Sequence, residues 1–157
     1  EKTVKKSICS LMASLLVAAD LIPIATGAVV GASLRHVSTL KPLLPARPEL
    51  NIALVNVVGS TILGSVYGLS MPSTSVLPKA VDAATAPLSR RATLLLGVGF
   101  CGSLTTFSTF SVDMVKLLEA GALSRCASLA FFSNVMGLAG ATLGLQGARA
   151  LRGVLLK

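Results

Sequence analysis

The sequence predicts an all-α membrane protein with four membrane-spanning helices. Only 13% of its 157 residues are charged and 53% are hydrophobic, whereas an average soluble domain has roughly 25% charged residues. The charges cluster and leave three uncharged intervals, residues 50–78, 92–112 and 126–148. A helix needs about 20 apolar residues to cross the hydrocarbon core, so each interval can cross it once. Strands are disfavoured, because barrel strands alternate apolar and polar residues and these intervals are continuously apolar.

A fourth span is predicted near the N-terminus. The apolar run 21–34 is short by itself but reaches about 20 residues when it is extended to 17–37. This extension places Asp20 near a water interface, where we expect it to start the helix, because a carboxylate at the bilayer centre is costly. The other three helices are predicted at residues 51–71, 92–119 and 126–146. The Pro-rich segments 41–49 and 72–91 are predicted to be loops.

These helices divide the chain into a four-helix domain, residues 17–148, and two flanking segments. Residues 1–16 carry three lysines before an apolar run, which fits a targeting remnant and equally fits an interfacial extension. The chain begins with Glu, and we expect an upstream piece to be missing. Residues 149–157 form a basic tail.

The net charge of +8 is explained by topology better than by a nucleic acid partner. The chain has no Trp, a single Tyr and no basic stripe beside aromatic residues. Lys and Arg instead flank the predicted spans. Without the N-terminal lysines, the two sides of a four-span chain carry six and five of these residues: Lys79, Arg90, Arg91, Arg149, Arg152 and Lys157 against Arg35, Lys41, Arg47, Lys116 and Arg125. So weak a bias favours dual topology, in which the chain inserts both ways and pairs with its own inverted copy.

Small residues recur at the spacing that lets helices approach closely. The pairs are Gly27 and Gly31, Ser60 and Gly64, Gly64 and Gly68, and Gly140 and Gly144. They predict tight helix packing, which is compatible with any function.

The segment 99–111 combines helix-breaking glycines with a cluster of hydroxyls inside a predicted span. The hydroxyls are Ser103, Thr105, Thr106, Ser108, Thr109 and Ser111. We therefore expect the third helix to be broken in mid-membrane, where its free backbone groups must be buried or must line a cavity. Carbonyls of such a break can bind a small cation. Phe107 and Phe110 would share one face of the resumed helix, and their positive ring edges suit an anion, although ordinary core packing explains the spacing as well.

Enzymatic catalysis is not expected. Cys9, Cys101 and Cys126 have neither disulfide-framework nor metal-ligand spacing, and His36 is the only histidine. The sequence also contains no phosphate-binding loop of the G-x-x-x-x-G-K-[ST] kind.

Three motifs in order resemble the CrcB/Fluc family of fluoride channels. They are a Gly-rich first helix (27–34) ending in Arg35, the pair Val55-Asn56 early in helix two, and the G-x-x-T-T-F-S-T-F run at 102–110. With a weaker match in helix four, the resemblance spans about residues 20–146. It implies an antiparallel, dual-topology homodimer in the plasma membrane, with two fluoride pores and a structural Na⁺ on the dimer axis.

The resemblance also implies roles for individual residues. Ring edges of Phe107 and Phe110 contact fluoride, and the amide of Asn56 donates to the ion. Thr142 matches a pore hydroxyl of helix four, and we also place Ser108 in the pore. Backbone carbonyls of Gly102 and Thr105 bind the Na⁺, and Arg35 is structural or vestibular.

Two positions depart from the family pattern. Ile52 stands where a Thr is usual, and Leu138 stands where a Ser is usual. Ser133 and Asn134 add polarity one turn earlier in helix four. Since unmet polar groups cost about 1–3 kcal/mol each, we expect one of the two pore paths to be weak or closed. A further hypothesis is that the chain is one half of a two-domain channel whose repeats have diverged, and that this half does not conduct.

The function predicted from these observations is passive, selective export of fluoride, which lowers fluoride in the cytoplasm. The main alternative is a small four-helix, proton-coupled multidrug exporter, which needs an intramembrane carboxylate, and only Asp20 could serve. A non-conducting membrane subunit, in which the two Phe are simply core, is a third possibility.

Overall fold

The computed structural model describes residues 2–70 and 88–155, with side chains described from residue 17 onward. Over these residues all regular secondary structure is helical, as predicted. Four stretches are long and apolar enough to span a membrane: Val17–Leu40, Glu49–Ser70, Arg90–Glu119 and Leu123–Leu155. The predicted loop at 72–91 lies largely outside the described residues.

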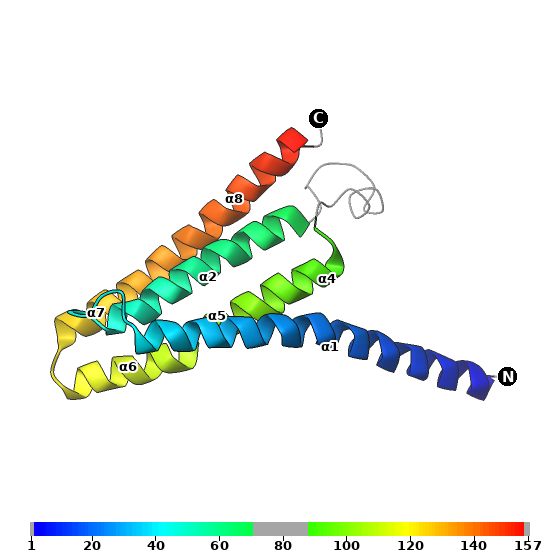
Figure 1. The fold of residues 1–157 in the computed structure, drawn as a ribbon, viewed down its shortest axis with the longest axis horizontal. Coiled ribbons are helices and arrows are strands. Elements are labelled where there is room, and N and C mark those ends of the chain that lie inside the picture. Colours follow the sequence, from blue (N-terminus) through cyan, green and yellow to red (C-terminus); the bar gives the residue numbers. More distant parts are fainter. Residues whose placement is uncertain (1, 71–87, 156–157) are drawn as a thin grey trace.

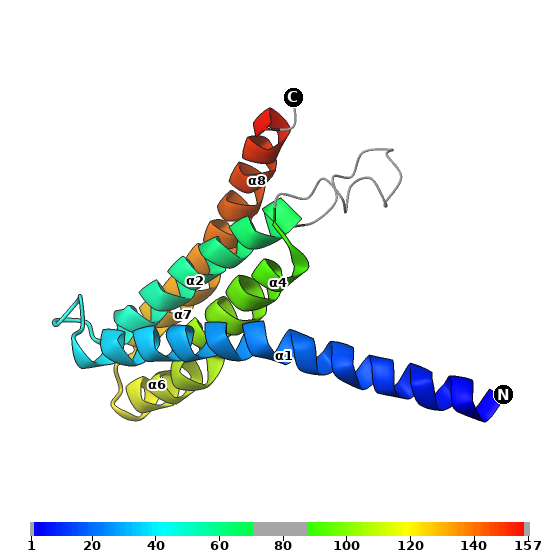
Figure 2. The same cartoon turned by 45° about the vertical axis from the view of Figure 1, so that its right-hand side comes forward.

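Helix α1 (Lys2–Leu40) is far longer than the predicted helix 17–37. Its 39 residues make a helix about 58 Å long, against a hydrocarbon core about 30 Å thick. The N-terminal stretch expected as a separate extension continues this helix, because it contains neither Gly nor Pro and is rich in good helix formers. In Figures 1 and 2 this stretch projects away from the other helices.

Asp20 does not start a helix, and that expectation is wrong. It lies in the middle of α1 and forms an ion pair with Arg90. The side chain of Arg90 is largely exposed in this pair, and that of Asp20 is partly exposed.

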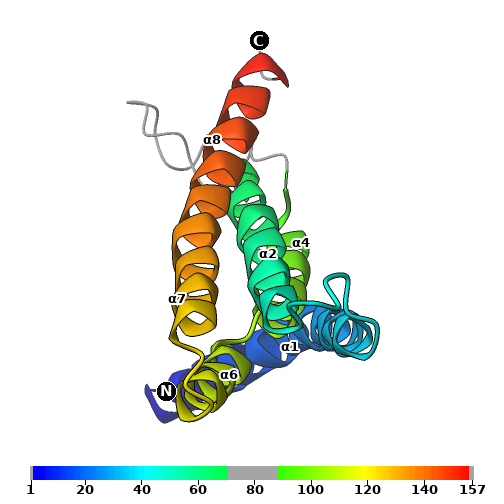
Figure 3. The same ribbon diagram turned by 90° about the vertical axis from the view of Figure 1, so that its left-hand side faces the viewer.

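Helix α2 (Glu49–Ser70) is the central element, and the third segment of the chain packs against it and α1. α2 lies beside α8 (Gly137–Leu155) (Figure 3). It also contacts the π-helical η1 (Leu94–Cys101), and α1 packs along η1 and α5 (Gly102–Leu104). The third segment opens with α4 (Arg90–Thr93) and ends with α6 (Phe107–Glu119).

The fourth segment is one long helix with a π-helical turn inside it. It consists of α7 (Leu123–Phe131), η2 (Phe132–Met136) and α8. It runs beyond the predicted end at residue 146 into the segment expected as a basic tail, where Arg152 is buried. A single Gly such as Gly147 costs a helix only about 1 kcal/mol, which does not suffice to end it.

Glycines set the distance between α2 and α8, as their spacing predicts. A Cβ atom on Gly64 would lie 2.2 Å from the carbonyl oxygen of Ala141, and one on Gly144 would lie 2.2 Å from that of Thr61. Cβ atoms do not occur at such distances from backbone oxygens, so only glycine allows the two helices to come this close.

Glycines also allow close backbone contact between α1 and η1. A Cβ atom on Gly27 would lie 2.0 Å from the carbonyl oxygen of Leu95, and one on Gly31 would lie 2.3 Å from that of Phe100. Close approach at glycine thus confirms the packing role predicted for these small residues.

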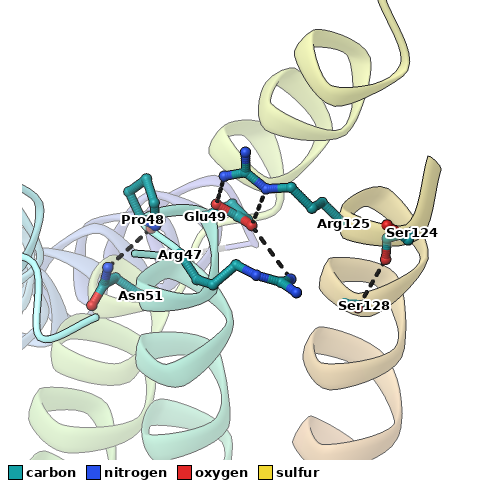
Figure 4. Close-up of polar contacts among 7 residues, drawn as sticks. All are labelled: Arg47, Pro48, Glu49, Asn51, Ser124, Arg125 and Ser128. Atoms are coloured by element: carbon teal, nitrogen blue, oxygen red, sulfur yellow. Dashed lines mark hydrogen bonds and ion pairs between the residues drawn. The ribbon is translucent and has the colours of Figure 1, made fainter. Parts of the chain in front are cut away.

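A bidentate ion pair closes one end of the bundle (Figure 4). Arg125 donates from Nε to Oε1 of Glu49 at 2.8 Å and from a terminal nitrogen to Oε2 at 2.6 Å. The Glu49 side chain is only 5% exposed, and Arg47 approaches it at 3.9 Å. This pair ties the start of α2 to α7, which follows α6 in the chain.

The glycine contacts give a matched prediction within one helix. Gly144→Ala should destabilise the protein by about 1–3 kcal/mol, because the new methyl group forces α2 and α8 apart. Gly147→Ala, where a Cβ would meet nothing within 4 Å, should leave stability unchanged or raise it by up to about 1 kcal/mol. Thermal unfolding in detergent measures both, and equal melting temperatures for the two variants would contradict the packing role.

The Glu49–Arg125 ion pair gives a second testable prediction. Arg125→Ala should lower the melting temperature because it leaves a buried carboxylate without its bidentate partner. Lys116→Ala is the control, since Lys116 makes an exposed ion pair with Asp113, and pairs of that kind contribute little. The second change Glu49→Gln should restore part of the stability lost in Arg125→Ala. An Arg125→Ala variant as stable as Lys116→Ala would show that the pair does not hold the bundle end.

Candidate functional site

The third segment leaves helical conformation at two consecutive threonines. α5 ends at Leu104, and Thr105 and Thr106 are extended, with φ, ψ of −77°, 153° and −151°, 119°. The helix resumes at Phe107, and the side chain of Thr106 caps it by accepting a hydrogen bond from the N–H of Thr109. Threonine suits this position because its hydroxyl can replace a backbone partner at a helix start.

Asn56 of α2 pairs with the backbone at this interruption. Its Oδ1 accepts the N–H of Thr106 at 2.9 Å, and its Nδ2 donates to the carbonyl of Thr106 at 3.4 Å. An uninterrupted helix would direct the Thr106 N–H to the carbonyl of Gly102. Asn56 takes this N–H instead, and it thereby supplies partners for the backbone groups that the interruption frees.

A hollow of about 230 Å³ opens beside this pairing. Its walls come from α2, the interruption, the start of α6, and η2. The lining residues are Asn56, Ser60, Thr105, Thr106, Phe107, Phe110, Ser133 and Asn134. Every polar group in this lining is a neutral amide or hydroxyl. A ligand in the hollow therefore meets hydrogen-bonding groups and aromatic rings rather than full charges.

The two phenylalanines differ in exposure. Their ring centroids lie 5.6 Å apart and the planes are tilted by 39°. Phe110 is 9% exposed and belongs to the core with Ile52, Ala53 and Leu129, whereas Phe107 is 77% exposed. Packing therefore fixes the ring of Phe110, whereas the ring of Phe107 lies on the surface of the chain.

The structure brings together three of the five residues predicted for the pore. Asn56, Phe107 and Phe110 line the same hollow. Thr142 lines a neighbouring, mostly apolar hollow of about 390 Å³, which shares Ser60 with the first. Ser108 is exposed and is not part of either lining; its hydroxyl lies 3.1 Å from that of Thr106.

Sequence reasoning did not place four lining residues in the site, namely Ser60, Thr106, Ser133 and Asn134. Ser60 follows Asn56 by four residues, a spacing that places both on one helix face and that could have predicted it. Ser133 and Asn134 add polarity to helix four, but the π-helical turn that contains them leaves no sequence signal that orients them.

The two departures from the family pattern have different surroundings. Ile52 is buried in the core with Phe110. Leu138 is 71% exposed and lines the apolar hollow beside Thr142. Arg35 lies half-buried on α1, outside the linings of both hollows.

The residues expected to bind a cation lie beside the interruption. Gly102 is exposed, and a Cβ atom there would have its nearest contact at 3.9 Å. The N–H that a continuous helix would donate to its carbonyl is donated to Asn56. Gly102 lies in α5, and Thr105, three residues later, is the first of the two extended residues.

Comparisons with known proteins identify one family. The family model described as CrcB-like protein, Camphor Resistance (CrcB), matches residues 22–145. Fluoride-specific ion channel FluC 2 of Synechococcus sp. (strain CC9902) is 36% identical over 133 residues, which cover 85% of this chain and 82% of the relative.

Two further relatives carry similar names. Fluoride-specific ion channel FluC 1 of Parasynechococcus marenigrum (strain WH8102) is 39% identical over 75% of this chain and 84% of its own length. Fluoride-specific ion channel FluC 2 of Symbiobacterium thermophilum is 37% identical over 77% of this chain and 90% of its own length. With the family model covering all four candidate spans in whole or in part, the chain belongs to the CrcB family.

Proposed function

We propose that this chain is a subunit of a fluoride-selective channel that exports the ion passively across a membrane. Membership of the CrcB family and relatives named as fluoride-specific channels support this function. The observation that carries it is the uncharged hollow in which Asn56 lies beside Phe107 and Phe110. The activity is transport rather than catalysis.

The lining suits a small, strongly hydrated anion. Fluoride loses water on entry and needs hydrogen donors and positive ring edges in return. An amide group has two hydrogens, and Asn56 uses one toward the carbonyl of Thr106. The second hydrogen of Asn56 can therefore donate to the ion while the interruption stays paired.

Passive flow is sufficient to protect a cell. When the medium outside a cell is acidic, fluoride enters as uncharged HF, dissociates in the less acidic cytoplasm and becomes trapped as the ion. A selective pore in the plasma membrane releases this trapped anion down its electrochemical gradient, so neither ATP nor a coupled proton is needed.

We further propose an antiparallel, dual-topology homodimer with two pores. The near-equal distribution of Lys and Arg supports it, and so does the 77% exposure of Phe107, a pore residue that a partner subunit would cover. A second homologous domain in a longer chain could take the place of the partner. The interruption would then lie at mid-membrane, beside the dimer axis.

A Na⁺ ion on that axis would be held by the backbone carbonyls of Gly102 and Thr105. It would supply a fixed positive charge that links the two interruptions. The exposure of Gly102 and the diversion of the Thr106 N–H to Asn56 support this placement.

The exporter alternative depends on Asp20, and the structure gives no support to that role. Asp20 is held in an ion pair with Arg90, whereas a coupling carboxylate must exchange a proton for a cationic drug.

Efflux from proteoliposomes tests the proposed function. Vesicles containing the chain and loaded with potassium fluoride should release fluoride to a fluoride-selective electrode when valinomycin relieves the potential, and empty vesicles should not. Vesicles loaded with potassium chloride instead should release no chloride to a chloride-selective electrode. Asp20→Asn should leave fluoride efflux intact. If correctly assembled protein released no fluoride, the chain would not conduct by itself. That result would favour the hypothesis that it is the non-conducting half of a two-domain channel.

The aromatic pair gives a more specific prediction. Phe107→Ile and Phe110→Ile should each slow fluoride efflux by about tenfold, since loss of an aromatic contact of about 1.5 kcal/mol in the rate-limiting step corresponds to that factor. Phe131→Ile is the matched control, because Phe131 is also partly exposed and also pairs with a neighbouring ring but does not line the hollow. Unchanged efflux in both pore variants, with normal elution in gel filtration, would show that neither ring takes part in conduction.

A further inference from the structure

A hollow of about 440 Å³ lies between α1 and the start of the third segment. One wall comes from the stretch of α1 between Ala19 and Thr26, and the other comes from α4 and the beginning of η1. The hollow shares no lining residue with the two hollows described above. The proposed ion path therefore does not account for it.

The hollow begins where the close contact between α1 and η1 ends. A Cβ atom on Gly27 would lie 2.0 Å from the carbonyl oxygen of Leu95, so the two backbones touch there. Leu95 also lines the hollow, which continues from this contact to Ala19 and Arg91. Because Ala19 and Ala92 carry only a methyl group, they leave the space between the two helices open.

The hollow lies at the ends of two candidate membrane spans. The first span begins at Val17 and the third begins at Arg90, and the lining comes from the first turns of both. Along α1 the lining extends from Ala19 to Thr26, which is about 10 Å of helix. This depth reaches from a membrane surface into the outer part of a hydrocarbon core about 30 Å thick. The hollow is thus at the level where lipid headgroups meet acyl chains.

Arg91 is the one charged residue in the lining. The charge of its neighbour Arg90 is balanced by the ion pair with Asp20. Among the described residues, no carboxylate lies within ion-pair distance of Arg91, whose side chain is exposed. Apart from Arg91 and Thr26, whose hydroxyl donates to the carbonyl of Ile22, the lining is apolar. A ligand with one negative group and an apolar chain complements this arrangement.

We propose that this hollow binds one anionic phospholipid. The guanidinium of Arg91 binds the phosphate, and an acyl chain occupies the apolar part between α1 and η1. Guanidinium groups bind phosphate through paired hydrogen bonds, and basic pockets between membrane helices bind anionic headgroups. A headgroup that also carries a positive charge fits less well, because that charge would lie close to Arg91. This site is independent of the ion that the protein conducts.

Native mass spectrometry of the full chain in detergent tests the site. Dioleoylphosphatidylglycerol should bind the wild type about tenfold more tightly than dioleoylphosphatidylcholine, which has the same acyl chains. Arg91→Gln should weaken phosphatidylglycerol binding about tenfold, the factor expected for one lost hydrogen bond to a charged group. Arg149→Gln is the matched control and should keep the wild-type affinity, because Arg149 is also exposed but lies outside the hollow.

A second variant keeps the charge and removes the space. Ala19→Trp fills the hollow from an exposed position, and it should weaken phosphatidylglycerol binding although Arg91 is still present. Wild-type affinity in this variant would overturn the proposal, because no acyl chain would then occupy the hollow.

Three further results would overturn the proposal. Equal losses in Arg91→Gln and Arg149→Gln would show that positive charge anywhere on the surface attracts the lipid. Equal affinity of the wild type for the two lipids would remove the role of the anionic headgroup. Displacement of the lipid by an equal concentration of glycerophosphoglycerol, which has no acyl chains, would indicate a site for the free phosphodiester. Since lipid binding is measured without transport, a chain that conducts no fluoride would overturn the proposed function and leave this test unaffected.

Discussion

The pairing of Asn56 with Thr106 is the interaction on which the rest of the site depends. A helix interrupted in apolar surroundings exposes an N–H and a carbonyl that have no water to bind. One amide side chain from α2 binds both groups of Thr106, across 50 residues of sequence. It also holds α2 against the interruption, and it directs the Thr106 N–H away from the carbonyl of Gly102. The hollow opens directly beside this contact, and both Asn56 and Thr106 line it.

The pairing requires that α2 be positioned closely, and the glycines provide this. Gly64 and Gly144 allow backbone contact between α2 and α8, which brings Ser60 on α2 and Ser133 on η2 to one cavity. Larger residues at these glycines would clash with the backbone of the neighbouring helix and force α2 and α8 apart. Close packing in this protein therefore sets the dimensions of the proposed pathway as well as the stability of the bundle.

Much of this could be predicted from the sequence, because uncharged length and motif order are strong signals in a membrane protein. The four spans, the interruption near 102–110 and the grouping of Asn56 with Phe107 and Phe110 were expected. The helix ends were not, since hydropathy fades at the lysine-rich start of α1 and the arginine-rich end of α8 although helix propensity persists there. The orientation of residues in and after the π-helical turn could not be predicted either. One inserted residue rotates everything after it by about 100°, so regular spacing does not orient Thr142.

Asn56 and Ser133 are both neutral hydrogen-bonding groups in the lining of the hollow. Asn56 contributes to folding and to the proposed ion path at once, so a substitution there changes both and cannot separate them. Ser133 contributes nothing to the fold through hydrogen bonding, since its buried Oγ has no partner among the described residues. A pore that relies on full charges would bind its anion too tightly to release it, whereas neutral donors of limited strength allow entry and exit. In the proposed pore, the amide of Asn56 would be such a neutral donor, held in place by its pairing with the backbone of Thr106.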